Sequence, residues 1–203
     1  GEGVDPGRVG ERVWIWNAQW QRPLGSAAEY VVLPAAQAVP LPAAIDFAAG
    51  ACLGIPAMTA FHAVNIDGPV AGKTLFISGG AGAVAHYAIQ IAKAGGATVI
   101  TTVSAEEKAA LARQAGADVV INYRSEEVAA IVQEQTGGRG ADVVIEMDLA
   151  ANASLLPGVL RPKGTVVAYG TSAMTVSLPA FFSLLNSIRI EFFLVYTLDA
   201  NER

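Results

Sequence analysis

The stretch Thr74-Leu75-Phe76-Ile77-Ser78-Gly79-Gly80-Ala81-Gly82-Ala83-Val84-Ala85-His86-Tyr87-Ala88-Ile89-Gln90-Ile91-Ala92-Lys93 decides the fold, because it predicts an apolar strand, a glycine-rich turn and a helix. Within it, residues 80–85 fit G-x-G-x-x-G/A, a pattern typical of dinucleotide-binding turns. Gly80 is expected to permit the tight turn, and Gly82 to leave room for a pyrophosphate. The helix would then offer its unpaired N–H groups to a phosphate. The alternative is a tight strand-to-helix turn that binds nothing.

Composition describes a protein with a large core. The 203 residues are 53% hydrophobic and 15% charged, which excludes a disordered chain. A net charge of −5 argues against a nucleic-acid-binding surface, and no apolar run reaches the roughly 18 residues of a membrane span. We therefore expect a soluble, cytoplasmic protein with no nucleic-acid or membrane partner. The single cysteine, Cys52, excludes an intramolecular disulfide and a cysteine-cluster metal site.

The chain changes character near residue 45. Residues 1–44 are rich in Gly, Pro and Trp and predict strands at Val13–Trp16 and Tyr30–Leu33, as at the end of an antiparallel β domain. Asp46 is a plausible N-cap, with short helices over residues 46–51 and 57–64. The first residue is not Met, and residues 199–203 resemble the start of a helix. We therefore expect a piece of a longer protein.

From residue 73 onward, strands and helices alternate. Runs such as Asp142-Val143-Val144-Ile145 are apolar without alternation, as in strands covered on both faces. The pattern predicts an α/β fold with a doubly wound, parallel, six-stranded Rossmann sheet. The predicted strands are Leu75–Ser78, Thr98–Val103, Val119–Asn122, Asp142–Glu146, Thr165–Tyr169 and Ile188–Val195, and the predicted helices are Ala83–Ala94, Ala105–Ala115, Glu126–Thr136 and Asn152–Leu160.

The end of the second strand of this sheet bears on the choice of cofactor. NAD-binding folds usually place an Asp or Glu there, to bind the ribose 2′-hydroxyl. Here the strand is followed by Ser104, and Lys108 lies in the first turn of the next helix. A hydroxyl and an ammonium group suit a 2′-phosphate, which favours NADPH. The alternative is that Lys108 is a solvated residue paired with Glu106 or Glu107.

Eight further segments, in order along almost the whole chain, carry a family resemblance: Gly10–Val13, Ala27–Tyr30, Gly54–Phe61, Gln90–Lys93, Gly116–Asp118, Ile121–Arg124, Gly138–Val144 and Gly164–Gly170. With the glycine turn, they resemble the quinone oxidoreductase (zeta-crystallin-like) branch of the medium-chain dehydrogenase/reductase superfamily. The resemblance implies an internal fragment, in which residues 1–44 are part of a GroES-like catalytic domain and residues 45–203 are an NADP-binding Rossmann domain.

The resemblance also implies which residues contact NADPH. The glycine turn would hold the pyrophosphate, the end of the second strand would hold the 2′-phosphate and ribose, and a third group would line the nicotinamide. These residues are Gly80, Ala81, Gly82, Ala83 and Val84 in the turn; Ser104, Lys108 and Tyr123 near the adenosine; and Thr59, Met147, Gly170, Thr171 and Tyr196 near the nicotinamide. Family members often carry Gly where Ala83 stands.

One position argues against a catalytic zinc site. Zinc alcohol dehydrogenases of this superfamily carry a Cys four residues before the Thr that aligns with Thr59, and Ile55 stands there instead. An isoleucine cannot ligate Zn²⁺, so we expect no metal site. Without zinc or a Ser-Tyr-Lys set we name no catalytic residue. The resemblance implies hydride transfer from NADPH to a small-molecule quinone or activated alkene (enone), with the protein supplying orientation.

Two other functions stay open, together with a question of assembly. The chain also resembles the enoyl reductase module of a polyketide or fatty-acid synthase. A non-enzymatic NADPH-binding structural or sensor protein is the other alternative. In either case, the strand Ile188–Val195 is expected at the sheet edge, where pairing with its twofold mate would give a homodimer.

Overall fold

The described part of the chain forms two compact units. The computed structural model describes residues 2–199, and the units are Gly1–Met58 and Thr59–Arg203. The domain boundary expected between residues 44 and 45 stays a prediction. The helix start expected at residues 199–203 lies outside the described residues, except for Asp199.

The first unit contains little regular structure. Strands β1 (Val13–Ile15) and β2 (Ala38–Pro40) pair antiparallel, and short 3₁₀ turns occur at Pro6–Arg8 and Ala35–Gln37. Helix α1 (Phe47–Ala51) begins after Asp46, whose side chain accepts a hydrogen bond of 2.7 Å from the backbone N–H of Ala49. The predicted N-cap is therefore confirmed. A π-helical turn, Leu53–Ala57, leads to α2 (Met58–Asn65).

The predicted strand Tyr30–Leu33 is wrong. The segment has no regular structure, and Tyr30 and Val32 are 91% and 95% exposed. β-branched and aromatic side chains favour extended backbone, but a strand also needs a neighbour that satisfies its backbone N–H and C=O groups. Within residues 2–199 no segment pairs with this one.

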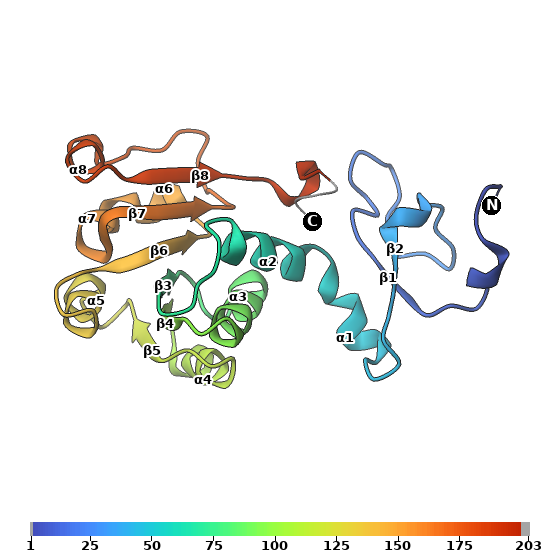
Figure 1. Ribbon diagram of the computed structural model, residues 1–203, viewed down its shortest axis with the longest axis horizontal. Coiled ribbons are helices and arrows are strands. Elements are labelled where there is room, and N and C mark those ends of the chain that lie inside the picture. Colours follow the sequence, from blue (N-terminus) through green and yellow to red (C-terminus); the bar gives the residue numbers. More distant parts are fainter. Residues whose placement is uncertain (1, 200–203) are drawn as a thin grey trace. The chain divides into compact units, whose positions relative to one another are not determined.

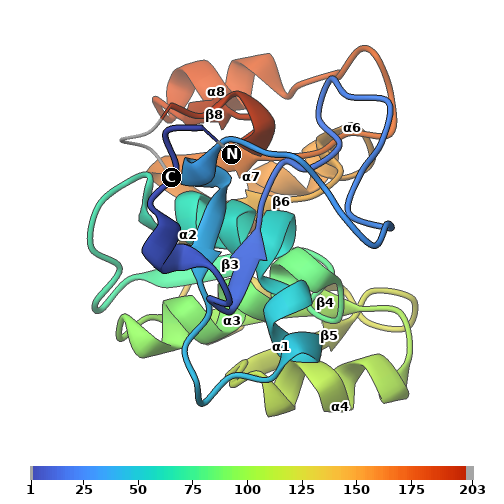
Figure 2. The same cartoon turned by 90° about the vertical axis from the view of Figure 1, so that its right-hand side faces the viewer.

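The second unit is built on a six-stranded parallel sheet, as predicted. Its strands are β3 (Thr74–Ile77), β4 (Thr98–Val103), β5 (Val119–Asn122), β6 (Ala141–Glu146), β7 (Leu160–Ala168) and β8 (Arg189–Phe192). Their order is β5-β4-β3-β6-β7-β8 (Figure 1). This doubly wound order reverses its direction of strand addition between β3 and β6. Figures 1 and 2 place β8 at one end of this unit and β5 at the other. Strand β8 is shorter than the predicted Ile188–Val195: residues 193–194 have no regular structure, and residues 195–197 form a 3₁₀ turn.

Helices cover both faces of the sheet. They are α3 (Ala83–Ala94), α4 (Glu106–Gln114), α5 (Val128–Gln135), α6 (Leu149–Asn152), α7 (Leu156–Val159) and α8 (Ala180–Leu185). The single helix predicted over Asn152–Leu160 is wrong: α6 starts earlier because Asp148 caps it, and the 3₁₀ turn Ala153–Leu155 separates it from α7. In residues 2–199, no helix has the length and hydropathy that a membrane-spanning helix needs.

Two hydrophobic clusters fill the layers on either side of the sheet. Successive residues of a strand point to opposite faces, so Leu75 and Ile77 pack with α2, α3 and α4, while Phe76 packs with α5, α6 and α7. Both faces of β3 and β6 are therefore buried, which explains their continuous apolar runs. Because β3 and β6 are parallel neighbours, their carboxyl ends lie side by side at one edge of the sheet.

Candidate functional site

The glycine turn after β3 is fixed by its neighbours β4 and β6. Gly79 has φ +69°, so the residue in the left-handed conformation is Gly79. The sequence pattern instead predicts this role in the tight turn for Gly80. A Cβ at Gly80 would lie 2.8 Å from Thr101 Cγ2 and closer still to Thr101 Oγ1. Packing against β4 therefore requires a glycine at position 80. The N–H of Gly80 also donates to the carbonyl oxygen of Thr102 at 2.9 Å.

Helix α3 presents its amino end to solvent beside this turn. Gly82 is the N-cap residue and offers no side chain to the helix. Among the described residues, no group accepts a hydrogen bond from the backbone N–H of Ala83, Val84 or Ala85. These N–H groups and the positive end of the helix dipole form an anion site of the kind that holds pyrophosphate.

A pocket of about 770 Å³ opens at the carboxyl ends of β3, β4 and β6. This is the place where the strand order reverses, and where ligands bind in open α/β sheets. Six of the predicted site residues line it: Ala81, Gly82, Ser104, Lys108, Tyr123 and Met147. The rest of its lining includes Phe76, Ser78, Gly79, Thr102, Val103, Glu126, Glu127, Val128, Ala129, Asp148, Ala151, Asn152, Ser154 and Leu155.

Lys108 and Ser104 form the basic corner of this pocket. Lys108 Nζ donates to Ser104 Oγ at 2.9 Å. Glu106 pairs instead with Arg113, at 2.6 Å, and among the described residues Lys108 forms an ion pair with neither Glu106 nor Glu107, the two partners of the alternative. The hydroxyl and the ammonium group thus lie together on the pocket wall.

The remaining predicted residues do not line the pocket. Thr59 is buried on α2, Ala83 and Val84 lie in the first turn of α3, and Thr171 is exposed after β7. The others outside the lining are Gly80, Gly170 and Tyr196. A Cβ at Gly170 would overlap the carbonyl oxygen of Met147. The close approach of two backbone segments therefore accounts for a glycine at position 170.

Sequence reasoning missed the polar residues that connect the ends of β3 and β6. Glu146 is 2% exposed, and its Oε1 accepts hydrogen bonds from Ser78 Oγ, the backbone N–H of Asp148 and Asn152 Nδ2, at 2.7–2.9 Å. Asp148 accepts from the N–H and the hydroxyl of Ser172, both at 2.9 Å, and these bonds lower its pKa. An Asp three residues before Ala151 is an N-cap signal that could have identified Asp148, whereas Glu146 gives no local signal.

The chemistry of the pocket is that of binding and orientation. Its lining combines one ammonium group, hydroxyls, the carboxyl groups of Glu126, Glu127 and Asp148, and apolar walls, and the amino end of α3 follows directly after its lining residue Gly82. Within residues 2–199, no group of three or more His, Cys, Asp or Glu side chains is arranged to hold a metal ion. Such a site can fix a phosphate-bearing cofactor in the orientation that a transfer reaction needs.

Comparison with known proteins gives the family. The model of the family described as zinc-binding dehydrogenase matches residues 83–203. A quinone oxidoreductase from Rattus norvegicus is 33% identical over 174 residues, which is 84% of this chain and 51% of that protein. A 2-haloacrylate reductase from Burkholderia sp is 36% identical over 175 residues, with the same two shares. The chain thus spans about half the length of the curated relatives it matches.

A solved structure agrees with these sequence relatives. The Escherichia coli quinone oxidoreductase complexed with NADPH superposes with a TM-score of 0.71 at 29% identity, over 78% of this chain and 50% of that one. Because the strand order and the glycine turn are shared features of such folds, the Rossmann sheet and its recognition from sequence are both confirmed.

Proposed function

The chain belongs to the zinc-binding dehydrogenase family of medium-chain dehydrogenases/reductases, in the branch of the quinone oxidoreductases, and on this basis we propose that it binds NADPH in the pocket beside the glycine turn. The bound cofactor would supply the hydride for a quinone or an activated alkene such as an enone. The relative that acts as a 2-haloacrylate reductase supports an activated alkene as acceptor.

One observation carries this proposal: Ala81 and Gly82, which lead into the amino end of α3, and the Lys108–Ser104 corner line the same pocket. The N–H groups of residues 83–85 suit a pyrophosphate. Lys108 and Ser104 suit a 2′-phosphate, and Met147, on the opposite wall beside Gly79, suits the nicotinamide end. A basic group opposite an anion site is needed for NADPH and is unnecessary for NADH.

The proposed reaction needs no zinc. Ile55 stands where zinc-dependent members of the superfamily carry a Cys ligand, and a hydrocarbon side chain cannot coordinate the metal. The protein's part is to bind the cofactor, orient its reactive face and exclude water. The product's proton would come from solvent, so we assign no catalytic residue.

The 2′-phosphate assignment is tested by comparing Lys108→Ala with Arg113→Ala. Both variants remove one positive charge from α4, but Arg113 does not line the pocket. A hydrogen bond to a charged group contributes about 1.5–3 kcal/mol, so K108A should weaken NADPH binding roughly tenfold to a hundredfold and leave NADH almost unchanged. Titration calorimetry with both nucleotides measures this. An equal loss for NADPH and NADH, or the same loss in R113A, contradicts the assignment.

The reductase activity is tested on the full-length protein by following NADPH oxidation with 1,4-benzoquinone and with an enone. Turnover supports the proposal. Tight NADPH binding without turnover of any acceptor favours the sensor or structural alternative. The enoyl reductase alternative is decided by the flanking sequence, since carrier-protein or ketoreductase modules beside this chain would identify a synthase.

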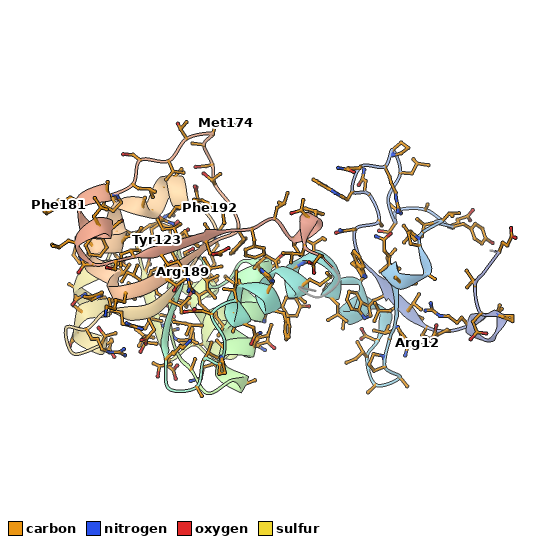
Figure 3. All side chains as sticks on the ribbon, turned by 45° about the horizontal axis from the view of Figure 1, so that its top comes forward. Arg12, Tyr123, Met174, Phe181, Arg189 and Phe192 are labelled. Atoms are coloured by element: carbon orange, nitrogen blue, oxygen red, sulfur yellow. The ribbon has the colours of Figure 1, made fainter. Side chains whose placement is uncertain are left out.

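We also propose a homodimer through the edge strand β8. Phe192 on β8 is 60% exposed, and the neighbouring α8 exposes Phe181, Leu184 and Leu185 at 72–80%. Figure 3 shows Phe181 and Met174 projecting away from the ribbon. An unpaired edge with apolar neighbours favours pairing with a second copy. The proposal is refuted if sedimentation equilibrium gives the mass of a monomer.

A further inference from the structure

We propose that Glu146 is a positioning residue of the nucleotide pocket: its buried carboxyl group holds the ends of β3 and β6 together and so sets the shape of the pocket walls. The inference rests on the proposed function only in taking this pocket as the NADPH site. Glu146 itself does not line the pocket. Its effect must therefore pass through the residues it binds.

The contacts of Glu146 reach both walls through a single oxygen atom. Oε1 accepts from Ser78 Oγ at 2.9 Å, and Ser78 is the residue between β3 and the glycine turn. The same atom accepts from the N–H of Asp148 at 2.7 Å and from Asn152 Nδ2 at 2.9 Å. Ser78, Asp148 and Asn152 all line the pocket, so one side chain ties the wall after β3 to the wall after β6.

Ser78 carries the link one step further. Its hydroxyl oxygen accepts a hydrogen bond of 3.2 Å from the backbone N–H of Met147. The Met147 sulfur lies over Gly79, 2.8 Å from the position a Cβ would occupy there. The hydroxyl also lies 3.4 Å from the carbonyl oxygen of Ile145, so loss of the Glu146 carboxyl group would leave this longer bond alone to orient the hydroxyl that holds Met147 against the glycine turn.

A buried carboxyl group is costly unless its hydrogen bonds are satisfied. At the other end of β6, Asp142 is also buried, at 8% exposed, and accepts from the Thr74 N–H and from Arg139 and Arg161. None of these partners lines the pocket. Asp142 is thus a matched control: it is a buried carboxyl group with hydrogen-bond donors of its own, and it lies on the same strand at the end away from the pocket.

The experiment compares Glu146→Ala, Glu146→Gln and Asp142→Ala in the chain. Amide hydrogen exchange without nucleotide is followed in residues 78–82 and 147–152, and NADPH affinity is measured by calorimetry. E146A should raise exchange in both segments and weaken NADPH binding roughly tenfold, as expected for the loss of the hydrogen bonds that join the two walls. E146Q keeps an acceptor oxygen and should restore both readouts. D142A should lower the urea midpoint without changing either.

The inference is overturned if E146A leaves exchange in both segments and NADPH affinity at wild-type values, or if D142A reproduces the effects of E146A. Where E146A does not fold, Ser78→Ala replaces it, because that variant removes one of the three donors and keeps the carboxyl group. S78A should then raise exchange at residues 147–152, and unchanged exchange there overturns the inference. Failure of wild type to bind NADPH refutes the proposed function, and the exchange comparison still decides the role of Glu146.

Discussion

Gly80→Ala should destabilise the fold for a reason unrelated to nucleotide. The added Cβ would lie 2.8 Å from Thr101 Cγ2 and closer to Thr101 Oγ1. Thr101 is fully buried, and its hydroxyl is committed to the carbonyl oxygen of Ile77 at 2.5 Å. The side chain cannot rotate away without losing this bond. Overpacking of this kind costs about 1–3 kcal/mol, which equilibrium urea unfolding without nucleotide should detect.

The double variant Gly80→Ala/Thr101→Ala isolates the cause. Truncating Thr101 removes both of the closest atoms and leaves its Cβ 3.1 Å away, a separation that a small shift relieves. The double variant should therefore be more stable than the sum of the single losses predicts, by roughly 1–2 kcal/mol. Additive losses would refute this reasoning. Gly82→Ala is the contrasting change: its Cβ would approach only Gly79 O, at 3.1 Å, so NADPH affinity should suffer more than stability.

Three further results are expected. Burial raises the pKa of Asp142, but donation from Thr74 N–H and from two arginines outweighs it and leaves the pKa below its usual value. The stability that Asp142 contributes is therefore fully present above about pH 3.9 and is lost as the pH falls through the lowered pKa. Urea midpoints of Asp142→Asn should fall less steeply with acid than those of wild type. Gly170→Ala should cost about 1–3 kcal/mol in urea unfolding, because its Cβ would overlap Met147 O. Phe192→Lys places a charge on the edge strand and should turn the proposed dimer into a monomer, which sedimentation equilibrium would measure.

The sheet could be predicted because its strands are continuous apolar runs and its helices keep one apolar face. The glycine turn could be found because its residues are adjacent in sequence. The strand expected at Tyr30–Leu33 failed because propensity says nothing about whether a partner is present. The helix expected over Asn152–Leu160 failed because the cap at Asp148 shifted its start and a 3₁₀ turn interrupted it.

The candidate site was predicted only in part, for a geometric reason. Ser104 and Lys108 are four residues apart, across the start of α4, so their contact is local and can be inferred from the sequence. Glu146 meets Ser78 across 68 residues, through the register of two parallel strands. No local pattern around Glu146 distinguishes it from any other carboxylate at the end of a strand.

The central position of β3 has a consequence for how the chain folds. Thr101 reaches Ile77 across 24 residues, whereas Glu146 reaches Ser78 across 68. The longer closure costs only about 1 kcal/mol more in chain entropy, but it depends on a segment that leaves the ribosome much later. A nascent chain that ends before β6 has the glycine turn and lacks the opposite wall. If the proposed function holds, nucleotide would stabilise this protein only after residues 141–152 have been synthesised and docked, and the cofactor would act on a late folding step.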